Sequence, residues 1–273
     1  MRILFLSAWC PLPADNGSKL RISHLLRGLG RTHEVDLLTF APEHQSLAAM
    51  NELRTFCHDV ELVSETPFAR RKSGLIRGLF SLQPRSMVAD FSELMGSAVR
   101  RRANYGYDLV IASQLHMAPY ALLLPDVPRL LEEIELAIMY DHYLQQDTFR
   151  SRIRAGMTWW KLRRYVTMTL NRFVAATAVS QRELDCLQAV SPSHVQLKVI
   201  PNGVDFAACS GDFGVAQPNT LIYPGALSWN PNFDAMRYFI ADILPHIQAH
   251  HPDIRLRITG RATEEQIADL PPF

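Results

Sequence analysis

Short runs of aliphatic residues alternate along this chain with longer segments of helical periodicity. The runs are mostly apolar, without a polar residue at every second position, as expected for strands that are covered on both faces. Strands that alternate with helices in this way predict a parallel sheet joined by crossover helices, and hence an α/β fold. The predicted strands are Ile3 to Leu6, Val35 to Thr39, Val60 to Val63, Leu109 to Ala112, Arg129 to Leu131, Val174 to Ala178 and Val195 to Ile200.

The segment from Ser18 to Leu29 predicts an amphipathic helix directly after the first strand. Its apolar stripe consists of Leu20, Ile22, Leu25, Leu26 and Leu29. Lys19, Arg21 and Arg27 are predicted to point outward into solvent. Further helices are predicted at Ser46 to Phe56, Ser92 to Ala103, Met117 to Leu124, Tyr143 to Arg172 with a break, and Gln181 to Ala189.

A segment rich in Gly, Asn, Asp, Ser and Pro extends from Pro201 to Asn219 and predicts a linker. We predict an N-terminal Rossmann-like domain at 1–198, a hinge at 199–219 and the start of a second Rossmann-like domain at 220–273. The strand and helix pattern resumes with Leu221 to Tyr223, Asn232 to Ala249 and Arg255 to Thr259. Two strands and two helices are too few to bury a doubly wound sheet, so we expect the second domain to be truncated.

The charge balance, the cysteine spacing and the lengths of the apolar runs limit the partners and the location that we expect. A net charge of +1, from 28 Lys and Arg against 27 Asp and Glu, gives no signal for nucleic acid. The four cysteines lack the paired spacing of a zinc site, so we predict reduced thiols and no metal site. The N-terminus has no secretory pattern, and no apolar run is long enough to cross a bilayer. We therefore expect a cytoplasmic protein.

The loop between the first strand and the first helix contains Gly17 and Ser18. In open α/β sheets, ligands bind outside the carboxyl ends of the strands. Glycine allows close approach of the backbone, and the N–H groups at a helix N-terminus can bind phosphate oxygens. The alternative is an ordinary turn with Ser18 at or near the helix cap. The dinucleotide fingerprint, the Walker A pattern and the nucleophile elbow are all absent from the sequence, which disfavours dehydrogenases, P-loop nucleotidases and serine hydrolases.

His116, Glu133 and Glu135 follow the predicted strands that end at Ala112 and Leu131. The carboxyl ends of parallel strands meet at one edge of a sheet, so these side chains are expected at a common rim. Their shared position makes them candidates for acid–base or positioning roles. The alternative is a surface histidine beside a solvated acidic face.

The segment 149–172 combines basic residues with Trp159 and Trp160 and contains no acidic residue. Cations and tryptophan on one helix are typical of a segment that lies on anionic lipid. A second basic tract, from Arg70 to Arg77, supports the same interpretation. The alternative is an ordinary scaffold helix whose tryptophans enter the core.

The segment Val199–Asp205, with the sequence VIPNGVD, resembles the passage between the two Rossmann-like domains of retaining GT-B glycosyltransferases of the family-four type. Three further segments agree with this resemblance: Gly17–Ser18, Val179–Glu183 and Leu221–Ala226. The stretch Leu227–Asp234 is similar to the bacterial exopolysaccharide branch. This sequence has Ala226 and Asn230–Asn232 where many members carry a donor-binding Arg and Lys.

The resemblance implies transfer of a sugar from a nucleoside-diphosphate donor to a saccharide or lipid-linked acceptor, without a metal or cofactor. The two basic segments add the expectation that this cytoplasmic protein lies at the inner face of the membrane. It implies that Gly17, Ser18 and Gly225 contact the donor diphosphate and that Asn202 and Gly203 form the hinge. His116 with Glu133 or Glu135 would orient the acceptor hydroxyl.

Two other functions stay open. A non-catalytic module that binds sugar nucleotides or a membrane surface, and that needs a partner chain, is the main alternative. A Rossmann-type epimerase or oxidoreductase is disfavoured by the missing glycine fingerprint.

Overall fold

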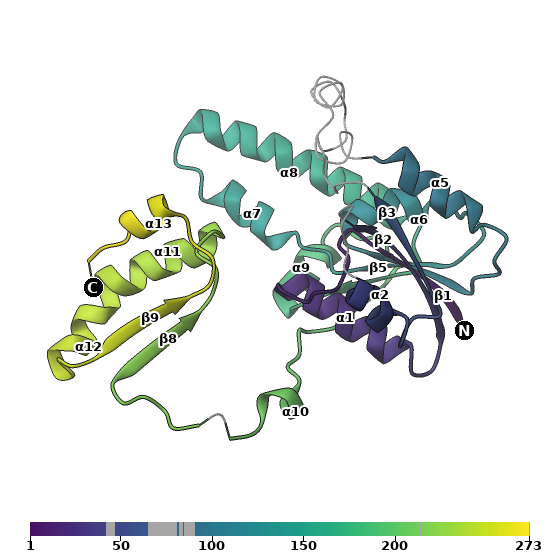
Figure 1. The fold of residues 1–273 in the computed structure, drawn as a ribbon. Coiled ribbons are helices and arrows are strands. Elements are labelled where there is room, and N and C mark those ends of the chain that lie inside the picture. Colours follow the sequence, from purple (N-terminus) through teal and green to yellow (C-terminus); the bar gives the residue numbers. More distant parts are fainter. Residues whose placement is uncertain (42–46, 65–80, 82–83, 85–90, 213, 273) are drawn as a thin grey trace. The chain divides into compact units, whose positions relative to one another are not determined.

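The computed structural model describes residues 1–41, 47–64, 81, 84, 91–212 and 214–272. The basic tract from Arg70 to Arg77 lies outside the described residues. The chain forms two compact units, Met1–Val204 and Asp205–Phe273. Each unit is described by itself below (Figure 1).

Unit 1 is built on a parallel sheet with the strand order β3-β2-β1-β4-β5-β6-β7. All seven predicted strands are present in it, so the predicted α/β fold is confirmed. The order reverses direction between β1 and β4, which makes their carboxyl ends a topological switch point. The strands are β1 (Arg2–Ser7), β2 (Glu34–Ala41), β3 (Asp59–Ser64), β4 (Leu109–Ser113), β5 (Arg129–Glu132), β6 (Ala175–Ala178) and β7 (Gln196–Val199).

Helices connect these strands and cover both faces of the sheet (Figure 1). The break predicted in the helix from Tyr143 to Arg172 is present at residues 145–148. A new helix begins after Thr148, whose hydroxyl accepts a hydrogen bond from the backbone N–H of Ser151. The helical segments are α1 (Gly17–Leu29), α2 (Leu47–Leu53), α5 (Glu93–Arg101), the 3-10 turn η1 (Leu115–Met117), α6 (Ala118–Ala121), α7 (Ala137–Leu144), α8 (Phe149–Leu170) and α9 (Gln181–Gln188).

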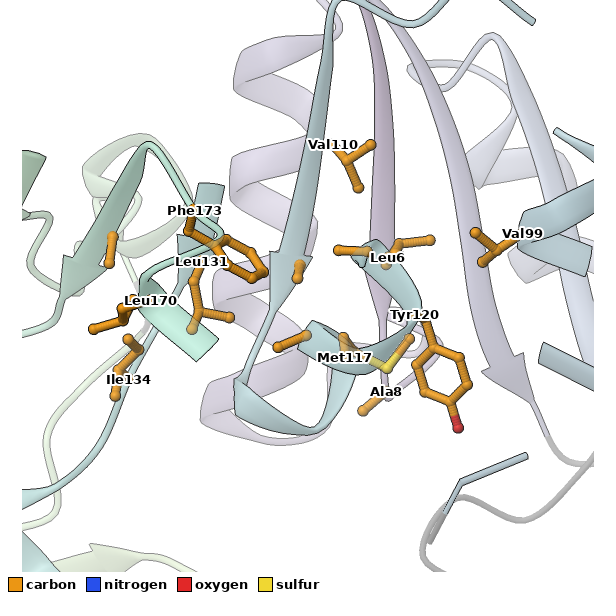
Figure 2. Close-up of a cluster of buried hydrophobic side chains, with 14 of the residues drawn as sticks. Leu6, Ala8, Val99, Val110, Met117, Tyr120, Leu131, Ile134, Leu170 and Phe173 are labelled. Carbon is orange, nitrogen blue, oxygen red and sulfur yellow. The ribbon is translucent and has the colours of Figure 1, made fainter. Parts of the chain in front are cut away.

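The core of unit 1 consists of two apolar clusters, one on each face of the sheet. Successive residues of a strand point to opposite faces, so Leu4 and Leu6 enter one cluster while Ile3 and Phe5 enter the other. Figure 2 shows part of the first cluster, in which Leu6 of β1 lies near Val110 of β4. This two-sided burial explains why the strands are apolar without alternation.

The predicted apolar stripe of α1 needs one correction. Ile22 and Leu26 are fully buried against the sheet, as the periodicity predicts. Leu20 is 43% exposed, because it lies in the first turn at the margin of the buried face.

Unit 2 contains a two-stranded parallel sheet of β8 (Thr220–Pro224) and β9 (Arg255–Thr259). The helix predicted from Asn232 to Ala249 begins two residues earlier and is interrupted by a π-helical stretch. Pro245 lacks the N–H that would donate to the Ala241 carbonyl in a regular α-helix, which accounts for the interruption. The helical segments are α10 (Phe206–Cys209), α11 (Asn230–Tyr238), η2 (Phe239–Ile243), α12 (Leu244–His250) and α13 (Glu264–Ala268).

Candidate functional site

Polar side chains gather at the carboxyl edge of the sheet in unit 1. The parallel register places Ser7 of β1 beside Ser113 of β4, and Ser113 beside Glu132 of β5. All three residues are buried. A row of buried polar groups at the switch point is unusual, because the other buried positions of these strands are apolar.

Arg21 of α1 enters this row, which corrects the prediction that it points outward. Its side chain is only 5% exposed, and its Nε and Nη2 atoms both lie 2.7 Å from Oε1 of Glu132. The other carboxylate oxygen of Glu132 accepts a hydrogen bond from the Ser113 hydroxyl at 3.2 Å. Arg21 is buried because this carboxylate, far away in sequence, offers the charge that its own helix lacks.

The same guanidinium reaches the predicted hinge segment. Nη1 of Arg21 donates to the side-chain oxygen of Asn202 at 3.0 Å. Both residues belong to unit 1, since the units divide between Val204 and Asp205. Gly203 is exposed, and a Cβ atom added there would meet open space.

Glu133 follows β5 and is buried beside this ion pair. Its backbone has the left-handed φ of 58°, and its N–H donates to the Thr177 hydroxyl at 3.3 Å. Burial raises the pKa of Glu133 to about 7, and the neighbouring Glu132 carboxylate adds to the shift. Its Oε1 lies 3.9 Å from Nε of Arg21. A carboxyl group with this pKa can both hold and release a proton at neutral pH.

The Gln114 amide connects Glu133 to the loop that precedes α1. Its Nε2 donates to the Ser18 hydroxyl at 2.9 Å and lies 3.5 Å from Oε2 of Glu133. Its Oε1 accepts from the indole N–H of Trp9 at 3.1 Å. Gln114 also has a left-handed φ of 71°. Left-handed residues other than glycine cost about 1–3 kcal/mol each and occur preferentially at functional sites.

The structure thus brings Ser18 and Glu133 together through a side chain that the sequence did not single out. Gly17 is the first residue of α1 and is exposed, and a Cβ atom added there would meet open space. The helix cap is Asn16, whose side chain accepts from the Lys19 N–H at 3.0 Å. Ser18 lies two residues beyond this cap, so its hydroxyl is available to Gln114.

His116 lies in η1, two residues after Gln114. Its ring is half-buried, and this burial lowers the pKa of His116 to about 4. The imidazole is therefore neutral at pH 7. From the same segment, the amide of Gln114 reaches Glu133.

Glu135 is exposed, and the segment that carries it is held by Glu183. The buried Glu183 carboxylate accepts from the backbone N–H groups of Leu136 and Ala137 at 2.7 and 3.0 Å. Ser180, the cap of α9, accepts in turn from the Glu183 N–H at 3.2 Å. The Val179–Glu183 motif therefore joins α9 to the start of α7.

Gly225 belongs to unit 2, directly after β8. Its N–H donates to the Thr259 carbonyl at 2.9 Å, and an added Cβ atom would lie 2.7 Å from Cε1 of Tyr223. Asn232 donates its side-chain N–H to the Ala226 carbonyl at 3.0 Å and closes the loop. A larger residue at position 225 would therefore require the Tyr223 ring to shift.

Within the described ranges, no group of three or more His, Cys, Asp or Glu side chains is arranged to hold a metal ion. None of the described helices has the length and apolarity that crossing a membrane requires.

A family model for glycosyltransferase family 4 matches residues 16–208. The chain belongs to glycosyltransferase family 4. The matched range covers α1, Ser113 and Glu132 of the polar row, and the Val199–Asp205 segment, and it identifies the protein as a transferase. A comparison with curated proteins finds no match.

Solved structures share the GT-B fold of this family 4 chain. Trehalose-6-phosphate synthase OtsA matches with a TM-score of 0.56 and 10% identity, over 99% of this chain and 69% of that chain. Sucrose-phosphate synthase from Thermosynechococcus elongatus matches with a TM-score of 0.54 and 14% identity, over 98% and 72%. UGT71G1 from Medicago truncatula, in complex with UDP-glucose, matches with a TM-score of 0.52 and 9% identity, over 97% and 67%.

Proposed function

We propose that this protein transfers a sugar from a nucleoside-diphosphate donor to a saccharide or lipid-linked acceptor in the synthesis of a cell-surface polysaccharide. The observation that carries the proposal is the Ser18–Gln114–Glu133 network at the switch point of a family 4 chain. UGT71G1, which shares the fold, binds UDP-glucose. The proposed donor is a UDP- or GDP-sugar. The proposed reaction uses no cofactor or metal and retains the configuration at the anomeric carbon.

The start of α1 is the proposed contact for the donor diphosphate. The helix has 13 residues, and its first turn contains no acidic side chain. The N–H groups of Gly17 and Ser18 lie at the positive end of the helix dipole, where negative charge is stabilised. Gly225 is proposed to contact the diphosphate from unit 2.

Glu133 is the proposed acid–base group for the acceptor. In the reaction the bond between the anomeric carbon and the diphosphate oxygen breaks, and the acceptor oxygen forms the new bond. The proton of the acceptor hydroxyl must leave, and a carboxylate with a pKa of about 7 can take it. The neutral imidazole of His116 and the side chain of Glu135 are proposed to orient that hydroxyl by hydrogen bonds.

The proposal is tested by a transfer assay with UDP- and GDP-sugars as donors and by calorimetry with the same nucleotides. We expect Glu133→Gln to lower kcat by about 100-fold or more, as removal of a general base does, while donor binding is retained. Glu93→Gln is the matched control, since Glu93 is a 70%-exposed carboxylate on α5. Binding of no sugar nucleotide, together with no transfer, would favour a non-catalytic module.

The proposed location is the cytoplasmic face of a membrane, where a lipid-linked acceptor would be found. The assay therefore includes detergent-dispersed polyprenyl-linked sugars beside free oligosaccharides. Turnover of free oligosaccharides alone would count against a lipid-linked acceptor.

A further inference from the structure

Helix α8 carries an apolar stripe on its exposed side. Phe149 is 80% exposed, Ile153 50%, Met157 58% and Trp160 51%. The spacings of four, four and three residues place these side chains on one face of a helix with 3.6 residues per turn. The opposite face is the one that packs on the sheet, through residues that include Leu162, Val166 and Leu170.

Basic side chains line both margins of this stripe. At 100° per residue, Arg152 and Arg163 lie along one margin, and Arg154 and Lys161 lie along the other. No acidic residue occurs between Phe149 and Arg172. Among the ion pairs of the described residues, none involves a basic residue of α8, so none of the described acidic side chains pairs with this charge.

The two tryptophans of α8 have different environments. Trp159 packs against the core and against the ring of Tyr140, with the ring centroids 5.2 Å apart. Trp160 is the exposed one. Packing of α8 in the core therefore explains why Trp159 is present, but it does not explain the exposed Trp160. An exposed tryptophan between cations is typical of a side chain that sits at a membrane–water interface.

We propose that the α8 stripe, comprising Phe149, Ile153, Met157 and Trp160, docks on the surface of an anionic lipid bilayer. The apolar side chains enter the boundary between headgroups and acyl chains, and the flanking cations contact lipid phosphates. Charge selects this occupant over a second copy of the chain, because two such stripes would bring cations of the same sign together. The inference deepens the proposed membrane location by naming the surface that docks, and it can be tested apart from the proposed function, since docking needs neither donor nor acceptor.

The test is co-sedimentation of the full chain with vesicles. We expect binding to vesicles of phosphatidylglycerol and phosphatidylcholine, and little binding to phosphatidylcholine alone. Each cation near an anionic surface strengthens binding about fivefold, so Arg152→Glu with Arg163→Glu should weaken it by about 30-fold or more. Ile153→Glu with Trp160→Glu should abolish binding. High salt should weaken the binding of the wild type.

The matched control is Leu94→Glu, because Leu94 is 61% exposed on α5 and lies outside the stripe. It should bind vesicles like the wild type, and circular dichroism checks that every variant is folded. Failure of the wild type to bind anionic vesicles would overturn the proposal, as would unchanged binding of the stripe variants. A concentration-dependent dimer that Trp160→Glu abolishes, without vesicle binding, would assign the stripe to a second copy instead.

Discussion

Arg21 and Glu132 form a buried ion pair whose partners depend on each other. Their side chains are 5% and 3% exposed. Removing one partner leaves the other charge without water or a counter-charge, which costs about 3–5 kcal/mol. We therefore expect Arg21→Met to lower the free energy of unfolding by this amount in urea titrations.

Arg27→Met on the same helix is the control for this prediction. Arg27 pairs with Glu52 at the surface, where both side chains are at least 41% exposed, so its loss should cost about 1 kcal/mol or less. Combining Arg21→Met with Glu132→Leu should recover part of the stability, because the Glu132 charge is then no longer buried without its partner. Equal losses for Arg21→Met and Arg27→Met would contradict the buried pair.

Glu133 makes the stability of the fold depend on pH. Its pKa in the folded protein is about 7, above the ordinary value of 4.5. The folded state therefore holds the proton more tightly than the unfolded chain. The stability that protonated Glu133 contributes to the fold is fully present below about pH 4.5 and is lost as the pH rises through 7. Over this pH range we expect the free energy of unfolding of the wild type to fall by up to about 3 kcal/mol relative to that of Glu133→Gln.

Urea unfolding of both proteins from pH 4 to pH 8 measures this effect, because the difference between them removes the other titrating groups. A constant difference across the range would mean that Glu133 titrates as an ordinary surface carboxyl.

At the scale of elements, Glu183 of α9 fixes the start of α7 by hydrogen bonds. Its carboxylate accepts from two buried backbone N–H groups, those of Leu136 and Ala137. Each buried N–H that loses its acceptor costs about 1–3 kcal/mol. We expect Glu183→Ala to lower the free energy of unfolding by about 2–4 kcal/mol and to increase amide exchange at residues 136 and 137.

Two variants on the same helix delimit this prediction. Glu183→Gln keeps one acceptor oxygen and should cost less than Glu183→Ala. Asp185→Ala removes an exposed carboxylate and should change stability by about 0.5 kcal/mol or less. Normal exchange at residue 136 in Glu183→Ala would show that α7 does not depend on this contact.

At the scale of the whole molecule, the two units differ greatly in how much apolar surface they bury. Both core clusters lie in unit 1. In unit 2 the buried apolar side chains among the described residues are Leu227, Met236, Ile240 and Leu244. We expect residues 1–204, expressed alone, to unfold cooperatively with nearly the midpoint of the full chain. Residues 205–273 alone should show no cooperative transition, because a two-stranded sheet is marginally stable.

Thermal unfolding followed by circular dichroism measures both fragments against the full chain. A fall of more than about 10 °C in the midpoint of the 1–204 fragment would show that unit 1 needs unit 2 for its stability.

The strands and most helices of unit 1 were predictable from the sequence, because burial on both faces of a sheet leaves a local signal. Runs such as Ile3 to Leu6 are apolar at every position, as expected for strands that are buried on both faces. The rim position of Glu133 followed as well, since the end of a strand in a parallel sheet determines which edge a residue reaches.

Only the tertiary structure decided which side chains meet at that edge. Helical periodicity assigned Arg21 to solvent, and the pairing that buries it depends on Glu132, which lies 111 positions away in the chain. The same holds for Gln114, whose left-handed backbone aims its amide at Ser18 and Glu133. Contacts of this kind arise when the strands pair, so periodicity, a local property, cannot predict them.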